Sequence, residues 1–270
     1  FGHRAVVVGA DRDELLAGLA VLPPGLPARS GRPVFVFPGQ GAQWVGMGRD
    51  LYTESEVFRA AIDECAAALA PYTDWSLVDA LHHGSLDRVD VVQPALFAVM
   101  VALAGLWRSH GVEPDAVVGH SQAEIVAAYV AGALSLKDAA KVVALRSRAL
   151  AQLADQGGMV SLALSAEQAA DRLAHWGERL PVAAVNGPGA VVVSGSPDVL
   201  DELLQSCEAD DISARRLPVT YAAHSAQVEA IRERLLADLA GITPRSADIP
   251  FYSTVTGEPI DTATLDAGYW

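Results

Sequence analysis

The sequence feature that most constrains the fold is a serine placed between a short apolar strand and a helix. The apolar pair Val117-Val118 runs into Gly119-His120-Ser121-Gln122, and a helical stretch rich in alanine and valine follows. In a nucleophile elbow of this kind, a sharp turn exposes the serine hydroxyl, and the first amides of the helix point at the oxygen of the group under attack. The same pattern also occurs as an ordinary turn between a strand and a helix. A catalytic interpretation therefore requires a base, an oxyanion site and a substrate anchor elsewhere in the chain.

The composition is that of a globular protein, because 51% of the 270 residues are hydrophobic, enough for a sizeable core. The formal net charge of −14 argues against a nucleic-acid or anionic-membrane surface, either of which needs clustered lysine and arginine. The longest apolar run, residues 95–107, is shorter than the ~20 residues of a membrane-spanning helix, so it predicts a core helix and no membrane contact. We therefore expect a cytoplasmic protein.

Neither the cysteines nor the paired histidines predict a metal site. Cys65 and Cys207 have no partner at metal or redox spacing, so we expect both to be reduced residues that pack in the core. His82 and His83 fall in an expected polar loop without a further ligand nearby, which favours solvated side chains. We expect no bound metal.

The first residues predict a linker within a longer polypeptide. Residues 1–4 run directly into the apolar residues 5–8, which predict a strand already in progress and no signal peptide. A helix from Arg12 to Leu22 is expected next, and the proline-rich residues 23–27 end it. The abrupt beginning and end suggest a piece cut from a longer chain.

Beyond this segment, the pattern predicts an α/β fold in two parts. A buried strand at 34–37 and the strand before Ser121 predict a short parallel sheet, with helices expected at 55–69, 92–110 and 136–153. From Gly157 onward the order is strand, helix, two strands, helix and strand, which is that of a ferredoxin-like unit. We therefore expect a larger α/β-hydrolase-like subdomain at 33–156 and 218–270, with a ferredoxin-like βαββαβ subdomain inserted at 157–217.

Arg146 is the candidate substrate anchor. It lies on the inward stripe of its helix, whereas Arg148 points elsewhere. An inward arginine is costly unless it is paired, and its planar fork suits a carboxylate held by two hydrogen bonds. Two partners remain open, an internal carboxylate such as Glu124 or the free acid of a substrate.

His224 is the best general base by elimination. His120 is tied to the other side of the elbow, and His175 lies in a helix of the inserted unit. A loop histidine with only structural hydrogen bonds remains the alternative. Backbone carbonyls of a late strand at 249–254 could orient the imidazole in place of an aspartate.

Two further loops lie near this expected site. Residues 38–43 contain two glycines, which suit either a tight turn or a second amide donor for an oxyanion. Asn186 ends a strand of the inserted unit, where a turn role is favoured over a place in the cleft between the subdomains.

Together these residues resemble the acyltransferase domain of modular type I polyketide synthases, which is related to the malonyl-CoA:acyl carrier protein transacylases. The motifs that carry the resemblance are Phe37-Pro38-Gly39-Gln40-Gly41-Ala42-Gln43-Trp44, Gly119-His120-Ser121-Gln122 and Leu145-Arg146-Ser147-Arg148. The resemblance extends from about Pro33 to the end of the sequence. Residues 1–32 look like the end of the linker that follows a ketosynthase domain.

By this resemblance, Ser121 is the nucleophile and His224 its base, the backbone amides of Gln40 and Gln122 form the oxyanion hole, and Arg146 binds the carboxylate of an extender unit. The acyl group would pass from CoA to Ser121 and then to the phosphopantetheine thiol of an acyl carrier protein. The resemblance thus implies an acyl-CoA substrate, a carrier protein and an adjoining ketosynthase domain as partners, and no covalently bound cofactor.

The same resemblance implies methylmalonyl-CoA as the substrate. Residues 88–93, which end in Gln93, look like the signature of methylmalonyl-selecting members. Tyr221-Ala222-Ala223-His224 is similar to their Tyr-Ala-Ser-His motif, and Ala223 leaves room where malonyl-selecting members carry a phenylalanine. Because a single methyl group is worth only ~1–3 kcal/mol, the alanine can loosen selectivity toward ethylmalonyl or similar units.

Two other functions remain open. A serine hydrolase or thioesterase-like enzyme with the same elbow needs an acidic residue between nucleophile and base. The acids available in that order all lie in the inserted unit: Asp198, Asp201, Asp210 and Asp211. An inactive docking module would keep the fold without the chemistry, which the presence of Ser121, His224 and Arg146 disfavours.

Overall fold

The computed structural model describes residues 2–22, 24–27 and 31–270. The chain divides into two compact units, Phe1–Pro33 and Val34–Trp270. The predicted linker corresponds to the first unit, although Phe1, Pro23 and residues 28–30 lie outside the described residues.

The first unit contains two short strands and one helix. β1 (His3–Arg4) pairs antiparallel with β2 (Leu26–Pro27), and α1 (Arg12–Ala20) lies between them in the chain. The prediction of a strand at residues 5–8 is wrong, because these residues are irregular and Val6 and Val8 are 82% and 90% exposed. An isolated strand leaves its backbone groups unpaired, and the described pairing of this unit stops at Arg4.

The second unit begins with a short, mostly parallel sheet. Its strands are β3 (Val34–Phe37), β4 (Ala116–Gly119), β9 (Phe251–Tyr252) and β10 (Pro259–Ile260), in the order β10-β9-β4-β3. β4 pairs in parallel with both β3 and β9, and β10 is the antiparallel edge. The carboxyl ends of β3 and β4 therefore lie at the same edge of the sheet, where the loop after each strand begins.

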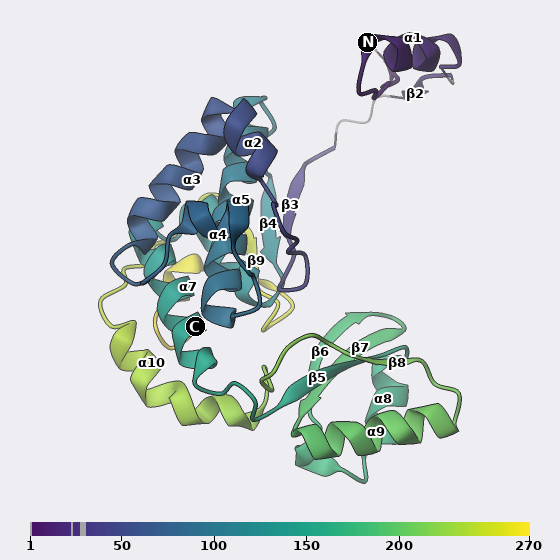
Figure 1. Ribbon diagram of the computed structural model, residues 1–270, viewed down its shortest axis with the longest axis vertical. Coiled ribbons are helices and arrows are strands. Elements are labelled where there is room, and N and C mark those ends of the chain that lie inside the picture. Colours follow the sequence, from purple (N-terminus) through teal and green to yellow (C-terminus); the bar gives the residue numbers. More distant parts are fainter. Residues whose placement is uncertain (1, 23, 28–30) are drawn as a thin grey trace. The chain divides into compact units, whose positions relative to one another are not determined.

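Helices build the core around this sheet (Figure 1). They are α2 (Arg49–Glu54), α3 (Glu56–Leu69), α4 (Leu77–His83), α5 (Val89–Ser109), α6 (Glu124–Ala131), α7 (Leu136–Ala151) and α10 (Arg232–Asp238). α5 packs against both α3 and α7, and α6 packs against the sheet. By length and composition α5 could cross a membrane, but 78% of its most apolar stretch is buried inside this core. It is a core helix, as the sequence predicts, although longer than the apolar run alone.

The prediction of a polar loop around His82 and His83 is wrong, because both residues lie in the last turn of α4. Ser76 caps this helix by accepting a hydrogen bond from the amide of Asp79, and the buried Leu77 and Leu81 attach it to the core. The helix is short and depends on these tertiary contacts more than on an apolar repeat of its own.

A second sheet lies between α7 and α10 in the chain. Its elements are β5 (Gly158–Leu162), α8 (Ala166–Leu173), β6 (Val182–Gly187), β7 (Ala190–Gly195), α9 (Pro197–Ala209) and β8 (Ala214–Arg216). The strand order is β6-β7-β5-β8, and every neighbouring pair is antiparallel. Helices α8 and α9 cover one face of this sheet (Figure 1), and the side chains between them form a core of their own. Strand, helix, two strands, helix and strand thus follow one another in the predicted order.

Both cysteines are free and buried. Burial raises the pKa of the Cys65 thiol to about 12, so it stays protonated and packs as a small apolar side chain. Among the described residues, no three histidine, cysteine or carboxylate side chains gather in a group that could hold a metal ion.

Candidate active site

Ser121 stands in a strained turn at the end of β4. Its φ angle of 56° lies in the left-handed region, which side chains other than glycine rarely adopt. A short 3-10 helix, Ser121–Ala123, leads directly into α6. Gly119 permits this geometry, because a Cβ there would lie only 2.3 Å from the carbonyl carbon of Ala123. The turn therefore has the geometry expected of a nucleophile elbow.

His224 lies within hydrogen-bond distance of the serine. Its Nε2 is 2.9 Å from the Ser121 Oγ, and its own φ angle is 55°. The pKa of His224 is lowered from its ordinary value, first by desolvation and then by the positive charges of Arg146 and His120. A neutral imidazole next to a serine hydroxyl is the arrangement that general-base catalysis requires.

The described residues provide no acidic side chain that bonds to His224. Asp201 forms an ion pair with Arg216, and Asp210 forms one with Arg172, both within the inserted unit. The predicted carbonyl partner from the late strand is also not found, because no hydrogen bond joins the His224 Nδ1 to this strand in the described part of the chain. The pair of Ser121 and His224 is therefore a dyad.

The loop after β3 lies against the elbow. The amide of His120 donates to the carbonyl of Phe37 at 2.9 Å, which joins the start of the loop to the turn. The side chain of Gln43 accepts from the amide of Gly41 at 2.7 Å and holds the loop in shape. Within the described residues, the backbone amides of Gln40 and Gln122 donate to no protein acceptor, so both are available to an oxygen near Ser121.

Two buried polar side chains, Gln93 and Tyr221, and the half-buried Gln40 form a closed network beside this loop. The Nε2 of Gln93 donates to the Oε1 of Gln40 at 3.2 Å and lies 3.2 Å from the hydroxyl of Tyr221. That hydroxyl donates to the same Gln40 oxygen at 3.1 Å. Gln93 and Tyr221 are 3% and 5% exposed, so the network is shielded from water. It fixes the side chain of Gln40, a residue that lines the cleft.

Arg146 lines the same cleft and is partly buried. Among the described residues, its guanidinium forms no ion pair or hydrogen bond, and desolvation lowers its pKa. The alternative internal partner, Glu124, is already satisfied, because it accepts from the amide of Thr254 at 2.6 Å and from the Tyr269 hydroxyl at 2.9 Å. Arg146 is thus a desolvated cation that Glu124 stabilises only through its charge, without an ion pair or hydrogen bond, and a direct anionic partner would suit it.

A cleft of about 1100 Å³ joins these groups. One side is formed by the elbow, α7 and the segment around His224, and the other by strands of the inserted unit. Ser121, His224, Arg146 and Gln40 all line this single cavity, so one ligand can contact all of them.

The acyl transferase domain family matches residues 34–270. The chain belongs to the acyl transferase domain family. It is 61% identical over 280 residues to erythronolide synthase EryA3 of Saccharopolyspora erythraea, covering 99% of this chain and 9% of that synthase. The chain therefore spans only a small part of the curated relatives it matches.

Solved structures agree with this assignment. The acyltransferase domain from module 8 of the salinomycin polyketide synthase superposes with a TM-score of 0.94 at 54% identity, covering 100% of this chain and 67% of that one. A match with a TM-score of 0.78 at 27% identity is found to the complex of a holo type II polyketide synthase acyl-carrier protein with its malonyl-transacylase. It covers 87% of this chain and 78% of that one. The chain is an acyltransferase domain of the type found in modular polyketide synthases. Such domains use an acyl-CoA substrate and need no bound cofactor.

The structure of this acyltransferase domain separates the predicted selectivity residues. Gln93, Tyr221 and Ala223 line the cleft, whereas Ala222 does not. Ala222 is fully buried against Gly157, where an added Cβ would lie 2.7 Å from the Ala222 Cβ. Because its methyl group fills the junction with the inserted unit, Ala222 cannot contact a ligand in the cleft.

The turn role that the sequence favours for Asn186 is wrong. It lies within β6 and lines the cleft of the acyltransferase domain. Its Oδ1 is 3.0 Å from the Nε2 of His120, so this pair connects the inserted unit directly to the elbow. The sequence contains no local signal for this contact, because 66 residues separate the two side chains.

Two polar groups in the cleft lack a protein partner, and the sequence gives no indication of this. The side-chain Oε1 and Nε2 of Gln122 are buried without a hydrogen bond from any described residue, and so is the Oε1 of Gln93. Buried polar atoms of this kind are costly unless a ligand or water satisfies them. They lie beneath the surface of the cleft, next to groups that line it.

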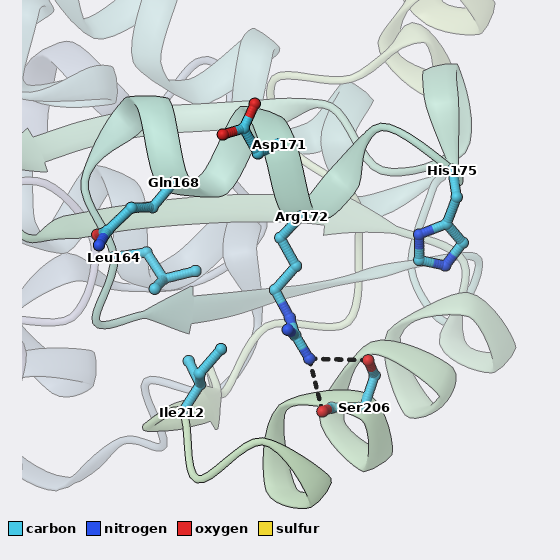
Figure 2. A pocket seen from close by; sticks show the side chains of 7 residues that line it. All are labelled: Leu164, Gln168, Asp171, Arg172, His175, Ser206 and Ile212. Carbon is cyan, nitrogen blue, oxygen red and sulfur yellow. Dashed lines mark hydrogen bonds between the residues drawn. The ribbon is translucent and has the colours of Figure 1, made fainter.

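A second, shallower hollow of about 570 Å³ lies on the inserted unit, between α8 and α9 (Figure 2). Arg172 reaches across it, donating to the Ser206 Oγ at 2.8 Å and forming an ion pair with Asp210. Its guanidinium is therefore used inside the protein, in contrast to Arg146. His175 lies at this hollow with its ring tilted by 39° against that of Trp176, and among the described residues no hydrogen bond joins it to Ser206, whose hydroxyl accepts from Arg172. It is no alternative to His224.

Proposed function

We propose that this domain loads a methylmalonyl extender unit from CoA onto Ser121 and then onto the phosphopantetheine thiol of an acyl carrier protein. The observation that carries the proposal is the joint placement of the Ser121 and His224 dyad and the unpaired Arg146 in one cleft. A dyad alone suits many acyl transfers, whereas a desolvated cation beside it selects an acyl group with a second, anionic end.

The chemistry follows from the dyad. The Ser121 hydroxyl attacks the thioester carbonyl while His224 takes its proton, and the amides of Gln40 and Gln122 stabilise the oxyanion. The carbon–sulfur bond then breaks, and His224 returns the proton to the departing CoA sulfur. The second half repeats these steps in reverse, with the carrier protein thiol as nucleophile and the Ser121 oxygen as leaving group.

Arg146 supports a dicarboxylic acyl group. A carboxylate on Arg146 would satisfy a guanidinium that has no hydrogen-bond or ion-pair partner among the described residues. Holding both ends of the short acyl group keeps its ester in one geometry, where a thiol can attack and water is disfavoured.

The methyl preference is supported by the residues that flank Ser121. Ala223 lines the cleft with a side chain of one methyl group and leaves space beside the α-carbon of the acyl group. Gln93 and Tyr221 close the other side through their network with Gln40. The pocket is therefore bounded without a bulky aromatic next to His224.

A serine hydrolase or thioesterase with the same elbow is the competing function. It has less support, because in the described part of the chain no aspartate of the inserted unit bonds to His224, and an apolar acyl pocket would leave Arg146 unpaired. An inactive docking module is disfavoured by the 2.9 Å contact between Ser121 and His224. We also propose that the first unit follows a ketosynthase domain and that the protein acts in the cytoplasm, which suits its net charge of −14.

Intact mass spectrometry tests the proposal. The protein is mixed with equal amounts of malonyl-, methylmalonyl- and ethylmalonyl-CoA, and the acyl adduct is measured before and after addition of a holo acyl carrier protein. We expect a methylmalonyl adduct that is absent from Ser121→Ala and that moves to the carrier protein. Release of the acyl group to water without transfer would favour the hydrolase, and no adduct would favour the docking module. A dominant malonyl adduct would refute the methyl preference alone.

A further inference from the structure

The open face of the second sheet forms one wall of the catalytic cleft. Helices α8 and α9 cover the other face, where Val160 and Leu162 are buried in the core of the inserted unit. Side chains alternate along a strand, so Ser161 of β5 points away from that core. The strand register places Val192 of β7 and Arg215 of β8 on either side of Ser161. All three line the cleft.

Arg215 therefore projects from the cleft face of this sheet. Its neighbour Arg216 lies on the opposite face and forms an ion pair with Asp201 of α9. Arg215 is exposed, and among the described residues it has no ion pair and no side-chain hydrogen bond. One arginine of the pair thus fastens the strand to its helix, while the other presents a free guanidinium to the cleft.

A second cation faces the cleft from the larger part of the domain. Arg232 begins α10, which packs against α7. Its one ion pair, with Glu229, has a length of 3.4 Å, and both side chains are 64% exposed. Surface pairs of this kind are weak, so Arg232 can exchange this partner for a ligand.

The charge of the cleft is opposite to that of the molecule. Its lining includes Arg146, Arg215 and Arg232 against the two carboxylates Glu124 and Glu229, while Arg216 only borders it with a guanidinium that is paired with Asp201. The whole chain has 19 lysines and arginines against 33 aspartates and glutamates. A positive cleft in an acidic protein concentrates anionic ligands at its mouth. Arg146 is assigned to the acyl carboxylate, which leaves Arg215 and Arg232 without a role.

We infer that Arg215, together with Arg232, binds the phosphate at the far end of the pantetheine arm. This inference rests on the proposed function, in which the thiol end of that arm lies at Ser121. The phosphate next to pantetheine is shared by CoA and by the prosthetic group of a holo carrier protein, so one site serves both halves of the reaction. The guanidinium fork suits phosphate oxygens, which accept two parallel hydrogen bonds.

The test compares thioesters with and without the phosphate. The rate of Ser121 acylation is measured with methylmalonyl-CoA and with the methylmalonyl thioester of N-acetylcysteamine, which carries no phosphate. We expect Arg215→Gln to lower kcat/KM for methylmalonyl-CoA about tenfold, as for a lost charge-assisted hydrogen bond at an exposed site. The kcat/KM for the N-acetylcysteamine thioester should change by less than about twofold. Arg232→Gln should act in the same direction. Arg234→Gln is the matched control, because Arg234 is exposed on the same helix, pairs with Asp238 and does not line the cleft.

Two further experiments are needed. One distinguishes the source of the phosphate, and the other separates this inference from the proposed function. Transfer from acyl-Ser121 to a holo carrier protein, but not to free pantetheine, should slow in Arg215→Gln if the carrier uses the same site. Calorimetric binding of free CoA and of pantetheine needs no acyl transfer, so it decides the inference even if Ser121 is never acylated. Equal losses with both thioesters, or CoA binding as tight as in the unsubstituted protein, would overturn the phosphate site.

Discussion

Replacing Arg146 with alanine is the most direct test of how the cleft selects its acyl group. The guanidinium lines the cleft with Ser121 and forms no ion pair among the described residues, and desolvation already lowers its pKa. Any anion that binds there forms a partly buried, charge-assisted pair. A neutral acyl end would instead leave the cation unsatisfied. The substitution should therefore affect diacid and monoacid thioesters in different ways.

The size of the effect follows from the environment of the pair. Removing one member of a buried, hydrogen-bonded charge pair costs about 2–5 kcal/mol, and the partial exposure of Arg146 places it at the lower end. We expect a loss of about 2–3 kcal/mol with methylmalonyl-CoA, or roughly 30- to 150-fold in kcat/KM. With propionyl-CoA, which lacks the second carboxylate, the value should stay within about threefold because no pair is lost.

The assay is the rate of acylation of Ser121 by each thioester, followed by intact mass. Arg148→Ala is the control on the same helix, because Arg148 is exposed and donates to the carbonyl of Tyr72 at 3.2 Å, away from the cleft. Arg146→Lys keeps the charge and loses the fork, and should give an intermediate loss with methylmalonyl-CoA alone. Equal losses with both thioesters in Arg146→Ala would refute carboxylate binding and point to a structural role.

Two other predictions concern the groups around Ser121. Tyr221→Phe removes one of the two donors to the Gln40 side chain, so the backbone amide of Gln40 is held less firmly. We expect the acylation rate constant to fall about tenfold with diacid and monoacid thioesters alike. A change confined to KM would contradict this. Because desolvation, Arg146 and His120 lower the pKa of His224, the acidic limb of the acylation rate should have its midpoint below the ordinary histidine value of about 6.5, and a midpoint above it would contradict the assignment. The same shift means that the unfolded chain binds this proton more readily, so the contribution of His224 to the free energy of unfolding is complete above about pH 6.5 and declines as the pH falls below it.

The elements that depend on local patterns were predictable from the sequence. The elbow, the inward stripe of α7 and the order of strands and helices from Gly158 to Arg216 follow from periodicity, caps and turns, which act over a few residues. Ser165 illustrates this, because it forms the predicted capping box with Gln168 at the start of α8. Short elements such as α2 and α4 were missed, since they are held by contacts with α3 and α5 rather than by a repeat of their own.

The parts of the site that depend on distant contacts were not predictable. The bond between His120 and Asn186, and the network that joins Gln40 to Tyr221, connect residues 66 and 181 positions apart. Ala222 and Ala223 are neighbours of the same type, and only the packing of Gly157 decides that one fills a junction while the other faces the ligand. The unpaired state of Arg146 likewise depends on Thr254 and Tyr269, which satisfy Glu124.

The close contact between Gly157 and Ala222 has a consequence for protein engineering. The chain enters and leaves the inserted unit at one junction, where the side chain of Gln227 also donates to the carbonyl of Gln156 at 3.2 Å. The two ends of this unit are therefore adjacent, and it can be exchanged as a single segment. Chimeras joined at this junction would exchange Arg215 and Asn186 together and retain Ser121, His224 and Arg146 of the host. The two walls of the cleft could then be varied independently, without altering the serine and histidine of the host.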